Sequence, residues 1–107
     1  MYNIEYSETA SLELYEIAEY IRNESMSEEI SAKVVLKIRE KIETKLMIFP
    51  NSGKVEFISS DGIVYRQIVV NGHYVIYRIE ETETENFVLI TNVIHDKRDK
   101  ENIIISD

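Results

Sequence analysis

Apolar residues recur at helical spacing in two stretches of the first half of the chain. The first stretch follows Ser7, a helix-capping residue type, and predicts a helix with Ala10, Leu14, Ile17, Ala18 and Ile21 on its buried side. A polar break at residues 23–27 offers Ser25 or Ser27 as the next cap. A second, longer helix then ends at residues 50–53, and its apolar stripe comprises Ile30, Val34, Val35, Ile38, Ile42, Leu46 and Phe49.

Shorter patterns on either side of this helical pair predict strands. Residues 2–6 alternate apolar and polar and read as a short opening strand, and residues 54–59 read as a weak strand before a turn at Asp61-Gly62. Residues 87–94 are nearly all apolar or β-branched, which predicts a strand buried on both faces, and a Glu-rich loop at 80–85 precedes it. We therefore expect one α+β domain over residues 1–107, with a short N-terminal strand and an antiparallel helical hairpin packed on an antiparallel β-sheet meander.

The pair Asn71-Gly72 predicts a tight β-hairpin, because a type I′ turn needs positive φ at both central positions. Counting outward pairs Val70 with His73, Ile68 with Val75, Arg66 with Tyr77 and Val64 with Ile79, all on one face of the sheet. Arg66 is then a cation among apolar side chains. It needs a carboxylate, carbonyl groups, a stack on Tyr77 or a ligand, since an unpaired buried charge is very costly.

Composition narrows the possible chemistry. The chain has no cysteine, and its two histidines, His73 and His95, are far apart in sequence, so no metal site is expected. The three glycines form no phosphate-binding loop, and we expect no nucleotide or other cofactor. No apolar run is long enough to span a bilayer and no signal-peptide pattern opens the chain, which predicts a cytoplasmic protein without a membrane partner.

The net charge of -8 hides a segregation of charge along the chain. Residues 33–79 carry eight bases and four acids, whereas the flanking segments together carry sixteen acids and four bases. Lys33, Lys37 and Lys41 are spaced four apart on the second predicted helix. They form either an ordinary solvated face or a docking surface for an acidic partner.

Several short motifs in a fixed order resemble the RelE/ParE superfamily of bacterial toxins. They are the helical hairpin ending in Phe49-Pro50 with a following Gly53, the hairpin motifs at 65–68 and 74–79, and the segment 93–99. The resemblance covers roughly residues 1–100. It implies the toxin of a type II toxin-antitoxin (plasmid stabilisation) module, neutralised by a cognate antitoxin. RelE-like members cleave mRNA on the ribosome, whereas ParE-like members inhibit DNA gyrase.

For a metal-free ribonuclease, the resemblance implies Glu56 as base, Arg66 as phosphate clamp and His95 as acid, with Lys54, Arg78 and Arg98 adding positive charge. Each has a plainer interpretation: His95 as a hydrogen-bonded strand-end histidine, Glu56 as a surface carboxylate, and Arg98 in a local salt bridge. Acidic residues crowd the C-terminal segment, where nucleolytic relatives use cations and an aromatic residue. This departure favours the ParE-like branch, with a degenerate non-toxic member as a third alternative. The apolar tail 103–105 suggests an edge strand or a contact with another chain, including a homodimer.

Overall fold

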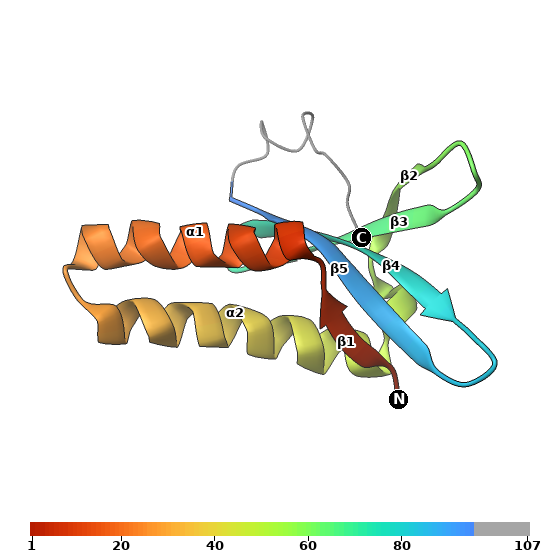
Figure 1. Ribbon diagram of the computed structural model, residues 1–107, viewed down its shortest axis with the longest axis horizontal. Helices are drawn as coiled ribbons and strands as arrows, with labels where there is room; N and C mark the ends of the chain where they lie inside the picture. Colours follow the sequence, from red (N-terminus) through yellow and green to blue (C-terminus); the bar gives the residue numbers. More distant parts are fainter. Residues whose placement is uncertain (96–107) are drawn as a thin grey trace.

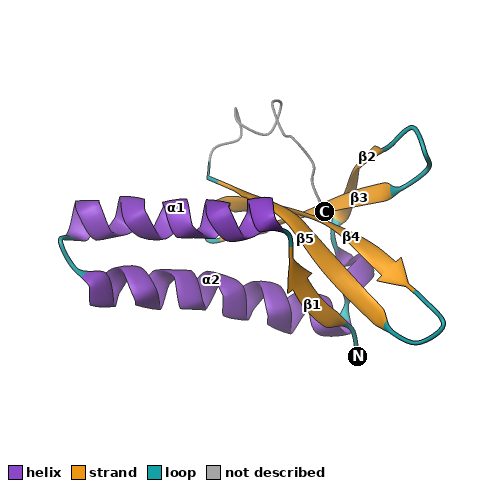
Figure 2. Ribbon diagram, in the orientation of Figure 1, coloured by secondary structure: helices purple, strands orange, loops and turns teal. Residues whose placement is uncertain are grey.

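Two antiparallel helices pack on a five-stranded sheet in the computed structural model, which describes residues 1–95 (Figures 1 and 2). The elements run in the order β1 (Asn3–Tyr6), α1 (Glu8–Ser25), α2 (Glu28–Ile48), a 3₁₀ turn η1 (Pro50–Ser52), β2 (Lys54–Ile58), β3 (Val64–Val70), β4 (His73–Glu81) and β5 (Asn86–Ile94). The α+β class and the helical hairpin are confirmed. The tail at 103–105 and Arg98 lie outside the described residues.

Serine side chains start both helices, as the sequence predicts. The Ser7 hydroxyl accepts a hydrogen bond from the Ala10 amide at 3.0 Å, and the Ser27 hydroxyl accepts one from the Ile30 amide at 3.1 Å. The break between the helices is shorter than predicted, because α1 continues through Ser25, whose hydroxyl donates to the Ile21 carbonyl one turn earlier at 2.6 Å. Ser27 is therefore the cap of α2, and Ser25 is not.

The strands form a mixed sheet in the order β1-β5-β4-β3-β2. The meander from β2 to β5 is antiparallel, as predicted, but β1 pairs in parallel with β5, from Asn3 opposite Phe87 to Tyr6 opposite Ile90. The predicted antiparallel meander is confirmed, and the opening strand, whose pairing the sequence left open, adds a parallel pair at one edge. A parallel pair needs a long crossover connection, and the helical hairpin is the first part of that connection.

The central hairpin has the predicted register. Asn71 and Gly72 have φ of 49° and 80°, as a type I′ turn requires, and the pairs Val70–His73, Ile68–Val75 and Arg66–Tyr77 are all present. The pairing of β3 with β4 ends there, so the fourth predicted pair, Val64–Ile79, does not form. The strand β4 continues to Glu81, two residues into the predicted loop. The local turn therefore sets which side chains share a face across β3 and β4.

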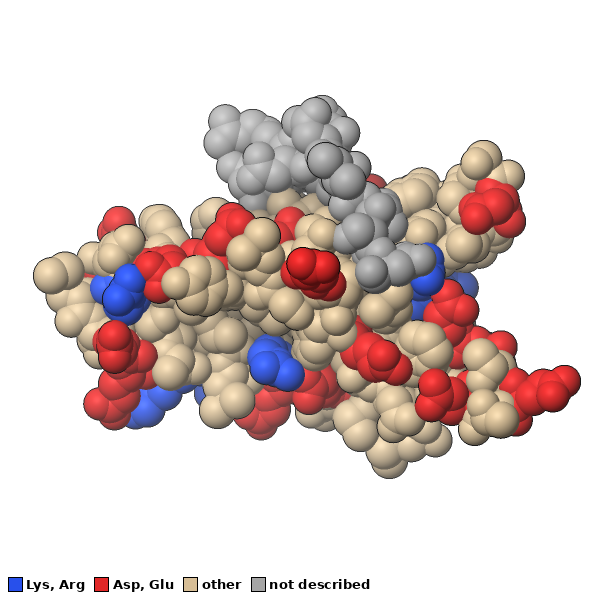
Figure 3. Space-filling view, in the orientation of Figure 1, with Lys and Arg blue, Asp and Glu red and all other residues tan. Residues whose placement is uncertain are grey.

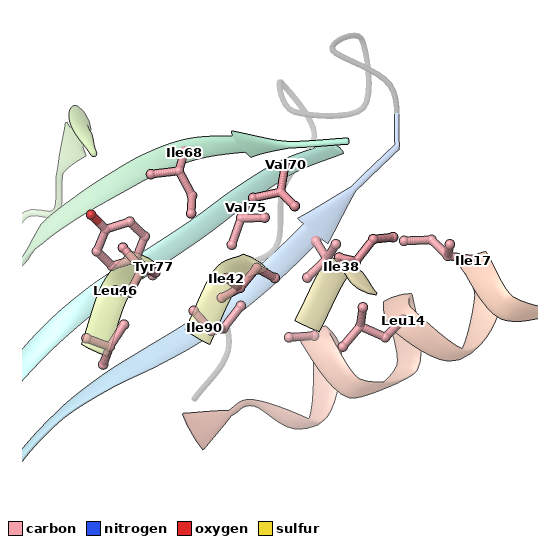
Figure 4. Close-up of a cluster of buried hydrophobic side chains, with 13 residues drawn as sticks. Leu14, Ile17, Ile38, Ile42, Leu46, Ile68, Val70, Val75, Tyr77 and Ile90 are labelled. Carbon is pink, nitrogen blue, oxygen red and sulfur yellow. The ribbon is translucent and has the colours of Figure 1, made fainter. Parts of the chain in front are cut away.

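The main core lies between the helices and the sheet (Figure 4). Its fully buried members on α2 are Ile38, Ile42 and Leu46, which face apolar side chains of β3, β4 and β5. Two residues of the predicted stripe are exposed, Ile30 at 49% and Phe49 at 66%, whereas Val34 and Val35 are half-buried against the core. Ile30 lies in the first turn of α2, at the end of the hairpin that projects beyond the sheet in Figure 1, and Phe49 is the C-cap, where the chain leaves the helix.

The other face of the sheet carries a second, smaller cluster, made of Tyr65, Ile76 and Ile94 with Ile63 and Tyr74 packed against it. Burial on this face as well as on the helix-facing side makes residues 88–94 of β5 buried throughout. The prediction of a strand buried on both faces is confirmed.

Ser7, the N-cap of α1, and Glu13 of α1 hydrogen-bond to the edge of β5 beyond the point where β1 ends. The Ser7 amide donates to the Ile90 carbonyl at 2.9 Å, and the Ser7 hydroxyl donates to the Thr91 carbonyl at 3.0 Å. The Glu13 carboxylate then accepts the Val93 amide at 2.8 Å. Burial raises the pKa of Glu13, and the hydrogen bonds of its carboxylate to the Val93 amide and the Asn92 side chain oppose that shift only in part. The start of α1 is thereby held against β5.

Candidate functional site

Arg66 lies on the helix-facing side of β3, opposite Tyr77 of β4. Its Nη1 atom donates to the Gly53 carbonyl at 2.9 Å and, with a longer bond of 3.4 Å, to the Asn51 carbonyl. Of the partners that the sequence left open, the structure places carbonyl groups against this guanidinium. Arg66 therefore holds the turn that joins α2 to β2.

Tyr77 closes the same turn from the inside. Its hydroxyl donates to the Pro50 carbonyl at 2.6 Å and accepts the Gly53 amide at 3.0 Å, and its ring is fully buried. Burial raises the pKa of this phenol, so it remains an uncharged donor at neutral pH. A Cβ atom on Gly53 would lie 2.5 Å from the Tyr77 hydroxyl and 2.7 Å from the Gln67 carbonyl oxygen. Close approach therefore explains the glycine at this position.

Among the strands of residues 1–95, β2 is the edge strand of the sheet next to this turn. Its register with β3 shifts between Val55 and Phe57, so Glu56 occupies an irregular position in the strand, one residue beyond the partner of Arg66. Lys54 is exposed at the start of the strand. Glu56, Lys54 and Arg66 thus come from the same end of the β2–β3 pair, but Lys54 is paired with Gln67 and so shares the face opposite to Arg66.

His95 lies at the other end of the sheet. Its Nδ1 atom is 3.3 Å from Nε2 of His73, the first residue of β4. His73 and Tyr77, the partner of Arg66, are four residues apart on β4, which corresponds to about 13 Å along the strand. Proton transfer needs groups within hydrogen-bonding distance. The three candidate catalytic residues therefore do not converge, because His95 is separated from Arg66.

Arg78 points away from the helices, to the opposite face from Arg66. Its Nη1 atom donates to the Tyr65 hydroxyl at 3.2 Å, and its Nε atom forms an ion pair with Glu80 at 2.8 Å. The residue is only 9% exposed. Arg78 and Arg66 consequently cannot both face one strand of RNA on the same side of the sheet.

The lysines of α2 are exposed along the helix. Lys33 forms an ion pair with Glu29 at 3.3 Å, a surface pair of small energy, and Lys41 donates to the Asn71 side chain at 2.7 Å, linking α2 to the hairpin turn. Lys37 lies between them on the helix. Acidic side chains instead gather at the β4–β5 loop, where Glu81, Glu83 and Glu85 are exposed (Figure 3).

Three features were not predicted from the sequence. They are the hydrogen bonds of Tyr77 to the turn at 50–53, the hydrogen bond of Glu13 to the Val93 amide of β5, and the contact between the two histidines. The pairing of Tyr77 with Arg66, read together with the Pro50-to-Gly53 segment, was the signal available for the first. The other two depend on contacts across 80 and 22 positions of the chain, for which no local pattern exists.

Comparison with known protein families identifies the chain. The family described as the ParE toxin of the type II toxin-antitoxin system parDE matches residues 4–100. The chain belongs to the ParE toxin family. Comparison with curated proteins gave no match.

A solved structure supports the fold of this ParE-family chain. A protein of the chromosomal ParDE toxin-antitoxin system from P. aeruginosa superimposes with a TM-score of 0.68, covering 88% of this chain and 95% of that one. The sequences are 12% identical, so the similarity extends to the fold alone.

None of the helices within residues 1–95 has the length and hydrophobicity that a membrane span requires. No group of three or more histidine, cysteine or acidic side chains is placed to hold a metal ion in that part of the ParE-family chain.

Proposed function

We propose that this ParE-family protein is a toxin that inhibits growth by binding DNA gyrase in the cytoplasm and that a cognate antitoxin neutralises it. The family match over residues 4–100 carries the proposal. Toxicity through a protein-protein contact needs no convergent acid and base. It is therefore compatible with a site whose candidate groups are dispersed.

The geometry around Arg66 supports the choice of gyrase over mRNA. A phosphate clamp must present its guanidinium to the substrate, whereas Arg66 donates to the carbonyls of the turn at 50–53. The imidazole of His95 lies at the far end of β4, beyond hydrogen-bonding reach of a group held by Arg66. An RNA-cleaving mechanism would need a different acid.

The exposed edge of β2 is the surface that we assign to the antitoxin. The side chains of Val55, Phe57 and Ile58 are 49%, 36% and 62% exposed, and β2 is paired only on its β3 side in the sheet of residues 1–95. A partner segment can add a strand to such an edge, with main-chain hydrogen bonds giving affinity and apolar pockets giving specificity. Phe57, stacked on Tyr65 at 4.7 Å, would be the fixed anchor of this contact.

We assign the lysine face of α2 to the toxic target. Lys33, Lys37 and Lys41 present positive charge on a protein that is acidic overall, so an acidic surface on the target would be attracted to this face. Antitoxin and target would then use different sides of the molecule.

The test is expression without antitoxin, followed by parallel measurements of DNA supercoiling by gyrase and of mRNA cleavage. We expect inhibition of supercoiling with intact message. The variant Lys33→Glu/Lys37→Glu should weaken the inhibition, whereas Lys54→Glu, on β2, should leave it unchanged. Cleavage of mRNA while gyrase stays active would instead establish a ribonuclease, provided that the cleavage is lost in the Glu56→Gln variant. Growth that is unaffected by expression of the folded protein would reject both activities.

A further inference from the structure

The two histidines of the chain meet at the ends of neighbouring strands. His73 begins β4, His95 directly follows β5, and the residues beside them, Tyr74 and Ile94, are paired across the two strands. Their ring centroids are 5.1 Å apart, and Nδ1 of His95 lies 3.3 Å from Nε2 of His73. No metal site was expected because the two histidines are far apart in sequence, but the fold brings His73 and His95 together.

The hydrogen bonds determine which nitrogen carries each proton. Nδ1 of His73 is 3.0 Å from the Asn71 carbonyl oxygen, and a carbonyl only accepts, so Nδ1 of His73 is the donor. Nε2 of the neutral His73 ring then has a lone pair, and His95 donates to it from Nδ1. A histidine whose Nδ1 donates to a backbone carbonyl is held as metal-binding histidines are, with Nε2 directed at the ion.

We propose that His73 and His95 form a two-histidine binding site for a divalent transition-metal ion, with Zn²⁺ as the representative, and that water completes its coordination. Tetrahedral zinc with Zn–N bonds of about 2.0–2.1 Å places two ligand nitrogens about 3.3–3.4 Å apart. The observed separation of 3.3 Å matches this spacing, so the strands need not move, and the rings turn until both lone pairs point at the ion. Imidazole ligands select zinc, nickel or copper over magnesium and calcium, which prefer oxygen.

Binding exchanges one hydrogen bond for two coordinate bonds. The lone pair of His73 Nε2 binds the ion directly. His95 loses its Nδ1 proton and gains one at Nε2, so that its Nδ1 lone pair becomes the second ligand and the neutral pair releases no net proton. His95 is exposed, which gives the ion and its water access to the site.

The surroundings orient the His73 ring before any ion arrives. The type I′ turn at 71–72 fixes the carbonyl that orients His73, and the Lys41 ammonium binds the side chain of the same turn at 2.7 Å. The Tyr20 ring of α1 lies 5.9 Å from the His95 ring. A bound ion would join the start of β4 to the end of β5 and would stabilise the folded state by mass action.

The test uses the full chain without an affinity tag, titrated with ZnCl₂ by calorimetry and followed by thermal unfolding. One ion should bind per chain, and His95→Ala and His73→Gln should each weaken its affinity by at least about tenfold. Glu83→Gln, a variant in the exposed acidic loop, is the matched control and should bind zinc like the wild type. MgCl₂ should give no saturable binding at this site, because magnesium disfavours imidazole.

Nitrogen NMR of the two imidazole rings keeps the test independent of variant folding. In the wild-type protein, zinc should shift the Nε2 resonance of His73 and the Nδ1 resonance of His95 together, at one equivalent. A shift of one ring alone would overturn the two-histidine site. Zinc affinity that is unchanged in a folded His95→Ala variant would overturn it as well, and would assign the ion to surface carboxylates.

Discussion

Replacing Gly53 by alanine tests the lock between the α2–β2 turn and the sheet. The new Cβ atom would lie 2.5 Å from the Tyr77 hydroxyl and 2.7 Å from the Gln67 carbonyl oxygen. Neither neighbour moves easily, because the Tyr77 ring is fully buried and the carbonyl belongs to the backbone of β3. The turn must shift away, and the hydrogen bond from the Gly53 amide to Tyr77 lengthens or breaks.

The expected loss follows from three contributions. Overpacking of this kind costs about 1–3 kcal/mol. A weakened hydrogen bond adds about 1 kcal/mol. Alanine also reduces the entropy of the unfolded chain, which returns about 0.4–1 kcal/mol because Gly53 has an ordinary extended backbone with φ of -76°. We therefore expect the free energy of unfolding to fall by about 1–3 kcal/mol, or roughly 4 °C in Tm for each kcal/mol.

The assay is urea unfolding of Gly53→Ala, Tyr77→Phe and the double variant. Tyr77→Phe should itself cost about 1–3 kcal/mol, because it leaves the Gly53 amide and the Pro50 carbonyl without their partner. Tyr77→Phe also removes one of the two clashing atoms. The double variant should therefore lose less stability than the sum of the two single variants, by about 0.5 kcal/mol or more. Tyr15→Phe, on an exposed side chain, is the control and should change stability by less than about 0.5 kcal/mol.

Two results would refute this reasoning. One is a Gly53→Ala variant as stable as the wild type, which would mean that the turn relaxes freely. The other is strict additivity in the double variant, which would mean that Gly53 and Tyr77 do not share the proposed contact.

Three further variants probe other parts of the molecule. Met26→Gly should raise the free energy of unfolding by about 1 kcal/mol in urea, because Met26 is 87% exposed and adopts a left-handed φ of 56°; an equal gain in Met26→Ala would contradict the backbone explanation. Burial raises the pKa of Glu13 above its ordinary value of 4.5. The folded protein then binds this proton more tightly than the unfolded chain does, so wild-type stability should fall as the pH rises above about 4.5. Glu13→Gln, which keeps an acceptor for the Val93 amide, should flatten that fall, and an unchanged pH profile would count against it. Burial first, and the neighbouring His95 second, lower the pKa of His73 below 6.5, so stability should decrease as pH drops below about 6.5. His73→Gln should lose this acid sensitivity, and a stability difference between wild type and His73→Gln that is the same at pH 5.5 and 7.5 would contradict the assignment.

Local patterns in the sequence were enough to predict the elements and one register. The Asn71-Gly72 turn needs positive φ at two adjacent residues, so it could be recognised within a few positions, and the pairing of β3 with β4 followed by counting. The serine caps of the helices are local in the same sense. The presence of Arg66 on the helix-facing side of the hairpin was therefore predictable, and so was its need for a polar partner.

The identity of that partner was decided by the tertiary structure. Carbonyls of residues 51 and 53 reach Arg66 only because the turn after α2 packs on β3, and Glu56 sits beside them only because β2 changes register there. The parallel pairing of β1 with β5 and the meeting of His73 with His95 likewise join segments that are distant along the chain. Periodicity records which face of an element is buried, but the element that covers this face is selected by packing of the whole chain. This is why the sequence alone determined the two helices, the hairpin and an inward-facing cation, whereas the fold decided what that cation binds and brought the two imidazole rings together.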